Sequence, residues 1–472
     1  MEANLEIIKH DSTEPYFHIA KEELKWMATS SSLTIVTLIL QYSFYFVNVV
    51  SVSHLGANKL AAMSLSITSQ GIFVVAPTLG LLSAMETFCS TAYTASSNKT
   101  LVGFHLQRGI IAVCFHFILV LPILWNLEKL LLLIGQDPEI SHLSGLFMRI
   151  NILLFLPYGL FEAIKRFLLA QGIMRVSTIV VIIVAPMNWL INFTLVRSST
   201  YGLGFIGAPI AGVITYILVL IVAFIYMYNS RAMEAWGGWK VSAFHNMSAF
   251  YRLAIPAVIT VCAEWVCFEM LTIGASYFGA NQMAGQVVLL STVGLMVQFS
   301  NGLGFGTSPR IGNLIGAAKP RQARIAADMA VLASLFLGAM GSLFLAMFGK
   351  WWISIYTDDP AVAYESVRLI PAACAFIVGN GLNAMFSAIL RGLGRQRASA
   401  NSFMFGFYVF AVPLGIYFAY ARHLETLGLW LGVSIGILVS SIFQLLYIYL
   451  WLDWKNEVRL CLLRLKINAQ SG

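Results

Sequence analysis

The chain has 472 residues, of which 59% are hydrophobic and only 11% are charged, and its formal net charge is +8. This composition excludes a soluble protein and predicts a chain that is embedded in a lipid bilayer.

Apolar windows long enough to cross a bilayer recur along the whole chain. In chain order they lie at about 29–50, 60–84, 104–125, 141–164, 176–196, 206–229, 253–274, 282–308, 325–348, 361–385, 399–420 and 427–451. The sequence therefore predicts an all-α polytopic membrane protein with twelve transmembrane helices.

The basic residues predict the orientation of these spans, because Lys and Arg collect on the cytoplasmic side of a membrane protein. With twelve spans the two ends of the chain share one side, and that side holds 22 of the 29 basic residues. We therefore expect both termini in the cytoplasm. The positive charge is explained by topology, so we expect no nucleic-acid partner.

Short motifs of the first half recur in the second half at a nearly constant shift in numbering, which predicts an internal duplication. The pairs are Leu55-Gly-Ala-Asn58 with Phe278-Gly-Ala-Asn281, Gln136-Asp-Pro138 with Asp358-Asp-Pro360, and Phe161-Glu-Ala-Ile-Lys-Arg166 with Phe386-Ser-Ala-Ile-Leu-Arg391. Because each copy contains six spans, the copies should be parallel repeats related by an axis along the membrane normal. The predicted parts are a tail at 1–28, a first lobe at 29–230, a cytoplasmic linker at 231–250, a second lobe at 251–451 and a cytoplasmic tail at 452–472.

Two carboxylates lie within the seventh predicted span. Glu264 and Glu269 interrupt the apolar run 253–274, and an ionisable group at membrane depth is costly enough to be read first as functional. Five residues of helix place the two side chains about 140° apart, so they should not face one point. Glu264 shares a face with Phe268. We predict that Glu264 couples transport to protons with Glu269 in a flanking role; a structural carboxyl group is the alternative.

Several motifs resemble those of the multidrug and toxic compound extrusion (MATE) transporters of eukaryotes, most closely the fungal members. They are Cys262-Ala-Glu-Trp265 with Phe268-Glu269, Gly312-Asn-Leu-Ile-Gly-Ala317, His54-Leu-Gly56, Phe161 to Gly172, and Ala185-Pro-Met-Asn188. The resemblance implies a V-shaped fold of two six-helix lobes related by a pseudo-twofold axis. It also implies export of small organic, often cationic, compounds by alternating access, coupled to inward flow of H⁺ or Na⁺. Glu264 matches the first acid of the family motif and Glu269 the second.

The residues expected to line a central cavity combine embedded polar groups with positions suggested by the resemblance. They are Gln41, Gln70, Tyr158, Trp265, Phe268, Gln286 and Asn380. Gln286 and Asn380 align with acids of animal relatives, so this cavity should select less strongly for cations. A packing role is the alternative for Gln41, Gln70 and Tyr158.

Other classes of protein fit the sequence less well. A lipid-linked oligosaccharide flippase has a related architecture but would carry a basic cavity, and an exporter coupled to Na⁺ is the other alternative. We expect no enzyme, because His105 and His116 have no acid partner nearby, and no cofactor or bound metal. A monomer should suffice for transport, in either the plasma membrane or a vacuolar membrane.

Overall fold

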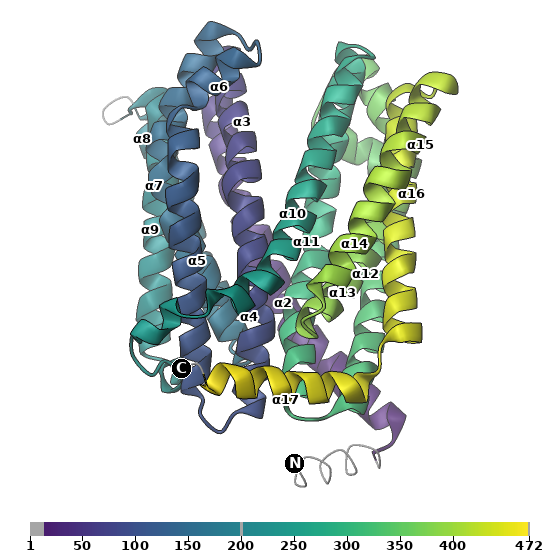
Figure 1. The fold of residues 1–472 in the computed structure, drawn as a ribbon. Helices are drawn as coiled ribbons and strands as arrows, with labels where there is room; N and C mark the ends of the chain where they lie inside the picture. The colour runs from purple at the N-terminus through teal and green to yellow at the C-terminus, as the bar shows by residue number, and fades with distance from the viewer. Residues whose placement is uncertain (1–13, 199–201, 471–472) are drawn as a thin grey trace. The chain divides into compact units, whose positions relative to one another are not determined.

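The computed structural model describes residues 14–198 and 202–470, and almost all of them are helical (Figure 1). Within this part of the chain, 12 helical segments are long and apolar enough to cross a membrane. The predicted all-α fold and the predicted number of spans are therefore confirmed.

Eight of the spans are single α-helices and four combine shorter ones. The single helices are α2 (Tyr16–Ser53), α5 (Thr100–Trp125), α7 (Pro138–Ala170), α8 (Arg175–Arg197), α10 (Met247–Ser276), α11 (Ala280–Gly316), α12 (Pro320–Ser354) and α13 (Pro360–Gly392). The composite spans are α3 (Ala57–Gln70), η1 (Gly71–Val75) and α4 (Ala76–Ala95); η2 (Gly204–Ile206) and α9 (Gly207–Tyr228); α14 (Gln396–Met404), η5 (Phe405–Ala411), α15 (Val412–Ile416) and η6 (Tyr417–Ala421); and α16 (Glu425–Leu446) with η7 (Tyr447–Trp451). Short elements outside the spans are α6 (Leu127–Leu133), η3 (Arg231–Ala235) and η4 (Val241–Phe244), and α17 (Trp454–Gln470) follows the last span.

The duplicated motifs mark equivalent helix starts. Asp137 precedes α7 and Asp359 precedes α13, and each carboxylate accepts a hydrogen bond from the backbone N–H two residues later, at 2.9 and 2.8 Å. A proline follows each cap at the first helical position, where its missing N–H costs nothing. Gly56 and Gly279 precede α3 and α11 with φ of 111° and 118°, which only glycine adopts readily. The sequence repeat is thus also a repeat of helix starts.

The chain divides into two compact units. Among the described residues, the carboxy-terminal unit comprises 14–35 and 259–467, and the amino-terminal unit comprises 36–198, 202–258 and 468–470. Two helices therefore pass from one unit to the other, α2 after Ile35 and α10 after Val258. The numbers of these two residues differ by 258 − 35 = 223, which is also the shift between the repeated glycines (279 − 56 = 223).

A glycine contacts each of these two helices at its transition point. In the carboxy-terminal unit, a Cβ atom added to Gly302 would lie 2.7 Å from the Cα atom of Ile35. In the amino-terminal unit, a Cβ atom added to Gly80 would lie 2.6 Å from the backbone nitrogen of Val258. The numbers of the two glycines differ by 302 − 80 = 222, so both copies use the same close helix crossing, which small residues permit.

The beginning of α2 is bound within the carboxy-terminal unit. The side chain of Glu23 is fully buried and accepts hydrogen bonds from Arg310 Nη2 at 2.6 Å, Arg310 Nε at 3.0 Å and Gln322 Nε2 at 2.9 Å. Trp26 adds a cation–π contact with Arg310 at 4.8 Å. Because these polar residues have partners in the protein, α2 begins at Tyr16, well before the apolar window at 29.

The helix α17 is docked on the same unit and runs across the direction of α16 (Figure 1). Its residues Trp454, Val458 and Cys461 are buried in the core formed with α11, α12 and α13. Arg395 donates two hydrogen bonds to Glu457, at 2.6 and 3.1 Å. These hydrogen bonds raise the pKa of Arg395, so the pair stays charged and holds α17 in place.

In the amino-terminal unit, α7 packs against α3, α4, α5 and α9. The linker after α9 is folded onto α5 rather than extended. Gln107 donates to the carbonyl of Gly238 at 2.6 Å and accepts from the N–H of Lys240 at 2.9 Å. Arg108 donates to the carbonyl of His245 at 3.0 Å. The connection to α10 is therefore fixed to this unit.

Candidate functional site

The seventh span, α10, carries both predicted acids in its central turns. Glu264 and Glu269 are each half-buried, as are Trp265 and Phe268. Phe268 packs edge-on against Phe376 of α13, with ring centroids 5.6 Å apart. This contact places the face of α10 that carries Glu264 and Phe268 beside α13, as the helical spacing of the two residues suggests.

The second copy of the repeated motif, Phe386 to Arg391, lies at the end of α13 in the same unit as Glu264. Its last residue, Arg391, extends toward α11, because a Cβ atom added to Gly304 would lie 3.9 Å from Arg391 Nη2.

Two further predicted cavity residues are buried in the carboxy-terminal unit. Gln286 on α11 is fully buried, and its Oε1 accepts a hydrogen bond from Trp430 Nε1. Asn380 on α13 is 3% exposed. Both lie on helices that form the core of this unit, and Trp430 packs edge-on against Phe376 at 5.7 Å.

A neutral hydrogen-bonded network, which sequence reasoning missed, links α13, α14 and α16. Ser387 shares a hydrogen bond with Ser399 at 2.8 Å and donates to Gln444 Oε1 at 3.0 Å. Gln444 Nε2 in turn donates to Asn383 Oδ1 at 2.7 Å, and Ser440 donates to the same oxygen at 2.9 Å. Every member is buried. Single polar residues scattered over three spans do not reveal such a network before the fold brings them together.

The equivalent place in the amino-terminal unit holds four buried charges, called here the amino-terminal charge cluster: Glu86, Glu162, Lys165 and Arg166. Glu162 contacts Lys165 Nζ at 2.5 Å and Arg166 Nη1 at 2.7 Å. Arg166 also lies 3.4 Å from Glu86. Two acids balance two bases, so the cluster is neutral as a whole. Glu162, Lys165 and Arg166 are neighbours at helical spacing, which explains why one motif supplies three of the four charges.

Gln41 joins this cluster from the first span. Its Nε2 lies 3.4 Å from Glu162 Oε1, and its Oε1 accepts a hydrogen bond from Lys165 Nζ at 3.3 Å. The structure therefore brings Gln41 together with charged groups of α7, at the position that corresponds to Glu264 in the other repeat (264 − 41 = 223).

The remaining predicted cavity residues of the amino-terminal unit make internal contacts. Gln70 accepts a hydrogen bond from Asn151 at 2.7 Å. Tyr158 is buried and packs edge-on against Tyr216, with ring centroids 5.6 Å apart. These two side chains thus take part in the packing of the unit, whereas Gln41 takes part in its charge cluster.

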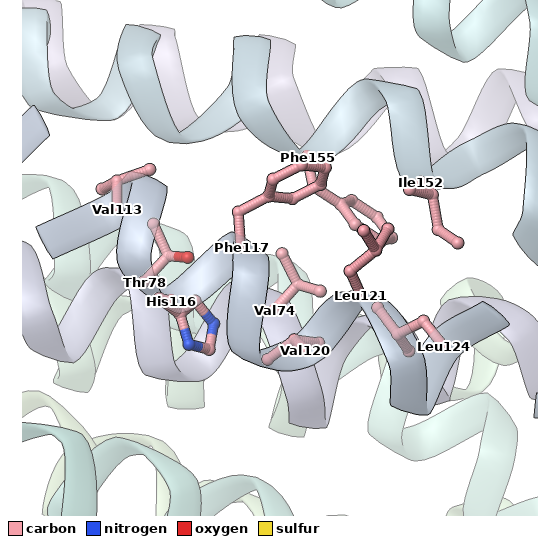
Figure 2. A pocket seen from close by; sticks show the side chains of 10 residues that line it. All are labelled: Val74, Thr78, Val113, His116, Phe117, Val120, Leu121, Leu124, Ile152 and Phe155. Carbon is pink, nitrogen blue, oxygen red and sulfur yellow. The ribbon is translucent and has the colours of Figure 1, made fainter. Parts of the chain in front are cut away.

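One small cavity lies inside the amino-terminal unit, and Figure 2 shows its lining. Its volume is about 10 Å³, close to the least that holds one water molecule, so it has no room for an organic compound. Thr78 and His116 are its polar lining residues. The full set is Val74, Thr78, Val113, His116, Phe117, Val120, Leu121, Leu124, Ile152 and Phe155. None of the predicted cavity residues is among them.

Comparison with known proteins agrees with the duplication. The sequence model of the MatE family matches this chain twice, at residues 34–194 and 256–417, and the starts of the two matches differ by 256 − 34 = 222. An uncharacterized transporter of Schizosaccharomyces pombe is 31% identical over 443 residues, covering 94% of this chain and 83% of the relative. Multidrug and toxin extrusion protein 1 of Xenopus tropicalis is 30% identical over 424 residues, covering 88% of this chain and 72% of the relative.

Among solved structures, the fold is similar to that of the eukaryotic MATE transporter AtDTX14. The TM-score is 0.88 at 26% sequence identity, over 94% of this chain and 99% of the other. A MATE transporter of Vibrio cholerae has a TM-score of 0.80 at 16% identity, covering 94% of this chain and 99% of that one, which is a likeness of fold alone.

Proposed function

The chain belongs to the MatE family of transporters, and from this premise we propose that it exports small organic, often cationic, compounds in exchange for protons. The observation that carries the proposal is the half-buried carboxyl group of Glu264 in the middle of an apolar span. An ionisable group at this depth marks an ion pathway by default. A carboxylate can hold either a proton or an organic cation, which is the exchange that an antiporter requires.

The proposed cycle uses alternating access. A cation binds while Glu264 is ionised and the site is open to the cytoplasm. A proton that enters from the opposite side neutralises Glu264 and removes the attraction, so the cation leaves. After the return step the proton is released to the cytoplasm, and the ionised carboxylate can bind cargo again. Binding to one carboxylate makes the two ligands mutually exclusive, which couples their movements.

We infer the orientation of the protein from its basic residues, and the number of copies that the cycle needs from the duplication. We place both termini in the cytoplasm, where most basic residues then lie. The plasma membrane and a vacuolar membrane both have the cytoplasm as the donor side. A single chain contains both repeats, so one copy should complete the cycle.

The test is export of a fluorescent organic cation from vesicles with an imposed pH gradient. The variant Glu264→Gln should abolish export driven by the gradient while the protein stays folded, because an amide cannot bind or release the proton. Wild-type export by this variant would contradict the proposal.

Matched controls separate the alternatives. The variant Glu269→Gln should retain export driven by the pH gradient, because its side chain projects from another face of α10. Export driven by a sodium gradient alone would identify a Na⁺-coupled exporter instead. Movement of a lipid-linked oligosaccharide without any cation export would identify a flippase.

A further inference from the structure

The linker between α9 and α10 exposes three large apolar side chains, although its backbone is fixed to α5. Trp239, Val241 and Phe244 are 72%, 78% and 67% exposed. Lys240, which lies between the first two, is exposed as well. A single exposed apolar residue is ordinary on a protein surface, but a group of them this close together indicates a contact surface.

The turn that presents Trp239 is fixed by contacts within the amino-terminal unit. Gly237 and Gly238 have φ of 67° and 77°, a left-handed conformation that glycine adopts without strain. Trp239 packs edge-on against Trp236, with ring centroids 5.1 Å apart. Gln107, a buried residue of α5, binds the backbone on both sides of Trp239. The exposed indole ring therefore belongs to an ordered turn.

The linker covers the side of α5 that faces lipid farther along the span. Phe115, Ile118 and Leu119 are 53%, 65% and 55% exposed, and such side chains in the middle of a span contact lipid tails. Phe104 and Arg108 precede Phe115 by 11 and 7 residues (115 − 104 and 115 − 108), about three and two helical turns, so they lie on the same side. Both are buried, and Arg108 donates a hydrogen bond to the linker. The linker thus takes the place of lipid here, and its outer surface is directed toward the surrounding membrane.

The contacts between α5 and the linker lie at the depth of the lipid headgroups. The helix α5 has 26 residues and is about 39 Å long, more than the hydrocarbon core of about 30 Å. Its polar residues Gln107 and Arg108 lie near its start, whereas no Lys, Arg, Asp or Glu occurs from Gly109 to Trp125. The first turns of α5, which bind the linker, therefore lie in the interfacial region. Tryptophan is enriched at this depth because its ring is apolar and its N–H is polar.

The charge of the linker favours an anionic lipid surface. Arg231, at its start, and Lys240 are both exposed. Exposed Glu234 offsets one of these two positive charges, and Lys240 remains as the charge beside Trp239. With the proposed orientation, the linker meets the cytoplasmic leaflet, which carries anionic lipids that attract basic residues.

We propose that the exposed linker residues Trp239, Lys240, Val241 and Phe244 form a membrane anchor that binds an anionic lipid surface. The three apolar side chains insert among the headgroups, and the Lys240 ammonium group binds the phosphate or carboxylate group of an acidic lipid. The anchor holds the linker end of the amino-terminal unit at a fixed depth. The choice of leaflet rests on the proposed orientation, whereas the anchor itself does not depend on the transport cycle.

The experiment measures quenching of tryptophan fluorescence by brominated phospholipids in vesicles that contain the full chain. The difference between the wild type and the variant Trp239→Phe reports on Trp239 alone. This difference signal should be quenched more strongly by bromine attached near the headgroup than by bromine near the end of the acyl chain. The matched control is Trp454→Phe, because Trp454 is buried in the core of the carboxy-terminal unit and its signal should respond to neither lipid.

The variant Lys240→Gln tests the preference for anionic lipid. One basic residue near an anionic surface contributes about 1 kcal/mol, so about fivefold less brominated phosphatidylserine than brominated phosphatidylcholine should give equal quenching of Trp239. In Lys240→Gln, measured against Lys240→Gln/Trp239→Phe, the two lipids should quench alike. Because both side chains are exposed, neither substitution should disturb the fold.

Two results would overturn the inference. A Trp239 signal that no brominated lipid quenches would mean that water or a partner protein, and not lipid, covers this surface. Equal quenching by the two lipids in the wild type would mean that the surface does not select anionic lipid. Both leaflets of the vesicles contain the same lipids and Glu264→Gln should show wild-type quenching, so this outcome is independent of the orientation and of the export assay.

Discussion

The two repeats differ in where their acidic residues lie within the membrane spans. In the amino-terminal unit the repeated motif reads Phe-Glu-Ala-Ile-Lys-Arg, and Glu162 lies in direct contact with Lys165 and Arg166. In the carboxy-terminal unit it reads Phe-Ser-Ala-Ile-Leu-Arg, and the acid lies on another helix, at Glu264. An acid held by two bases cannot easily exchange its charge, whereas an acid on a separate helix is free to do so. The position of one carboxylate on a shared scaffold therefore distinguishes the amino-terminal charge cluster from the site that we propose for transport.

The largest expected effect comes from breaking the amino-terminal charge cluster. The variant Glu162→Gln leaves Glu86 as one acid for the two bases Lys165 and Arg166. Removing one partner from a buried ion pair costs about 3 to 5 kcal/mol. We expect the purified protein to unfold at a clearly lower temperature in detergent, as measured by its intrinsic fluorescence.

A compensating change tests whether charge is the cause. The double variant Glu162→Gln/Lys165→Met restores neutrality within the cluster and should recover much of the lost stability. An unfolding temperature of Glu162→Gln equal to that of the wild type would mean that the cluster does not stabilise the fold.

The sequence predicted those features of the fold that depend on local patterns. Twelve apolar windows predicted 12 spans, and recurring motifs predicted the duplication. The contacts among Glu162, Lys165 and Arg166 also follow from a local pattern, because the three residues are neighbours on a helix. In these cases the partners lie within one turn, or the pattern repeats along the chain.

Contacts between distant segments could not be predicted in this way. Glu23 pairs with Arg310, far away in the chain, and this pairing explains why α2 extends back to Tyr16. A single sequence carries no sign that two such residues meet. The neutral network of Ser387, Ser399 and Gln444 was missed for the same reason, because its members lie on three different spans.

An intermediate effect is expected where a helix passes from one unit to the other. The variants Gly80→Ala and Gly302→Ala each place a methyl group against the backbone of a crossing helix, at 2.6 Å from the nitrogen of Val258 and 2.7 Å from the Cα atom of Ile35. Neither backbone can move aside as a flexible side chain could, so each variant should lose about 1 to 3 kcal/mol of stability. Similar losses in both variants, measured as unfolding temperatures in detergent, would support the equivalence of the two crossings.

The control for these crossings is Gly341→Ala in α12. Its added methyl group would lie 3.6 Å from Ile377 and 3.7 Å from Met296, which is ordinary van der Waals contact. This variant should unfold at nearly the wild-type temperature. Equal losses of stability in Gly341→Ala and Gly302→Ala would show that the loss does not depend on the close helix crossing.

The smallest effect is expected at Ser387, the residue of the second copy that corresponds to Glu162 of the first. Ser387 replaces Glu162 and binds Ser399 and Gln444 with neutral hydrogen bonds. The variant Ser387→Ala leaves Gln444 Oε1 without this donor, and hydrogen bonds between membrane helices contribute about 0.6 kcal/mol on average. We therefore expect a slight fall in unfolding temperature, well below that of Glu162→Gln, and no change in the pH of half-maximal export. A fall in unfolding temperature as large as that of Glu162→Gln would mean that the neutral network stabilises its unit as much as the charge cluster does. The two repeats would then differ in chemistry at this position but not in its structural role.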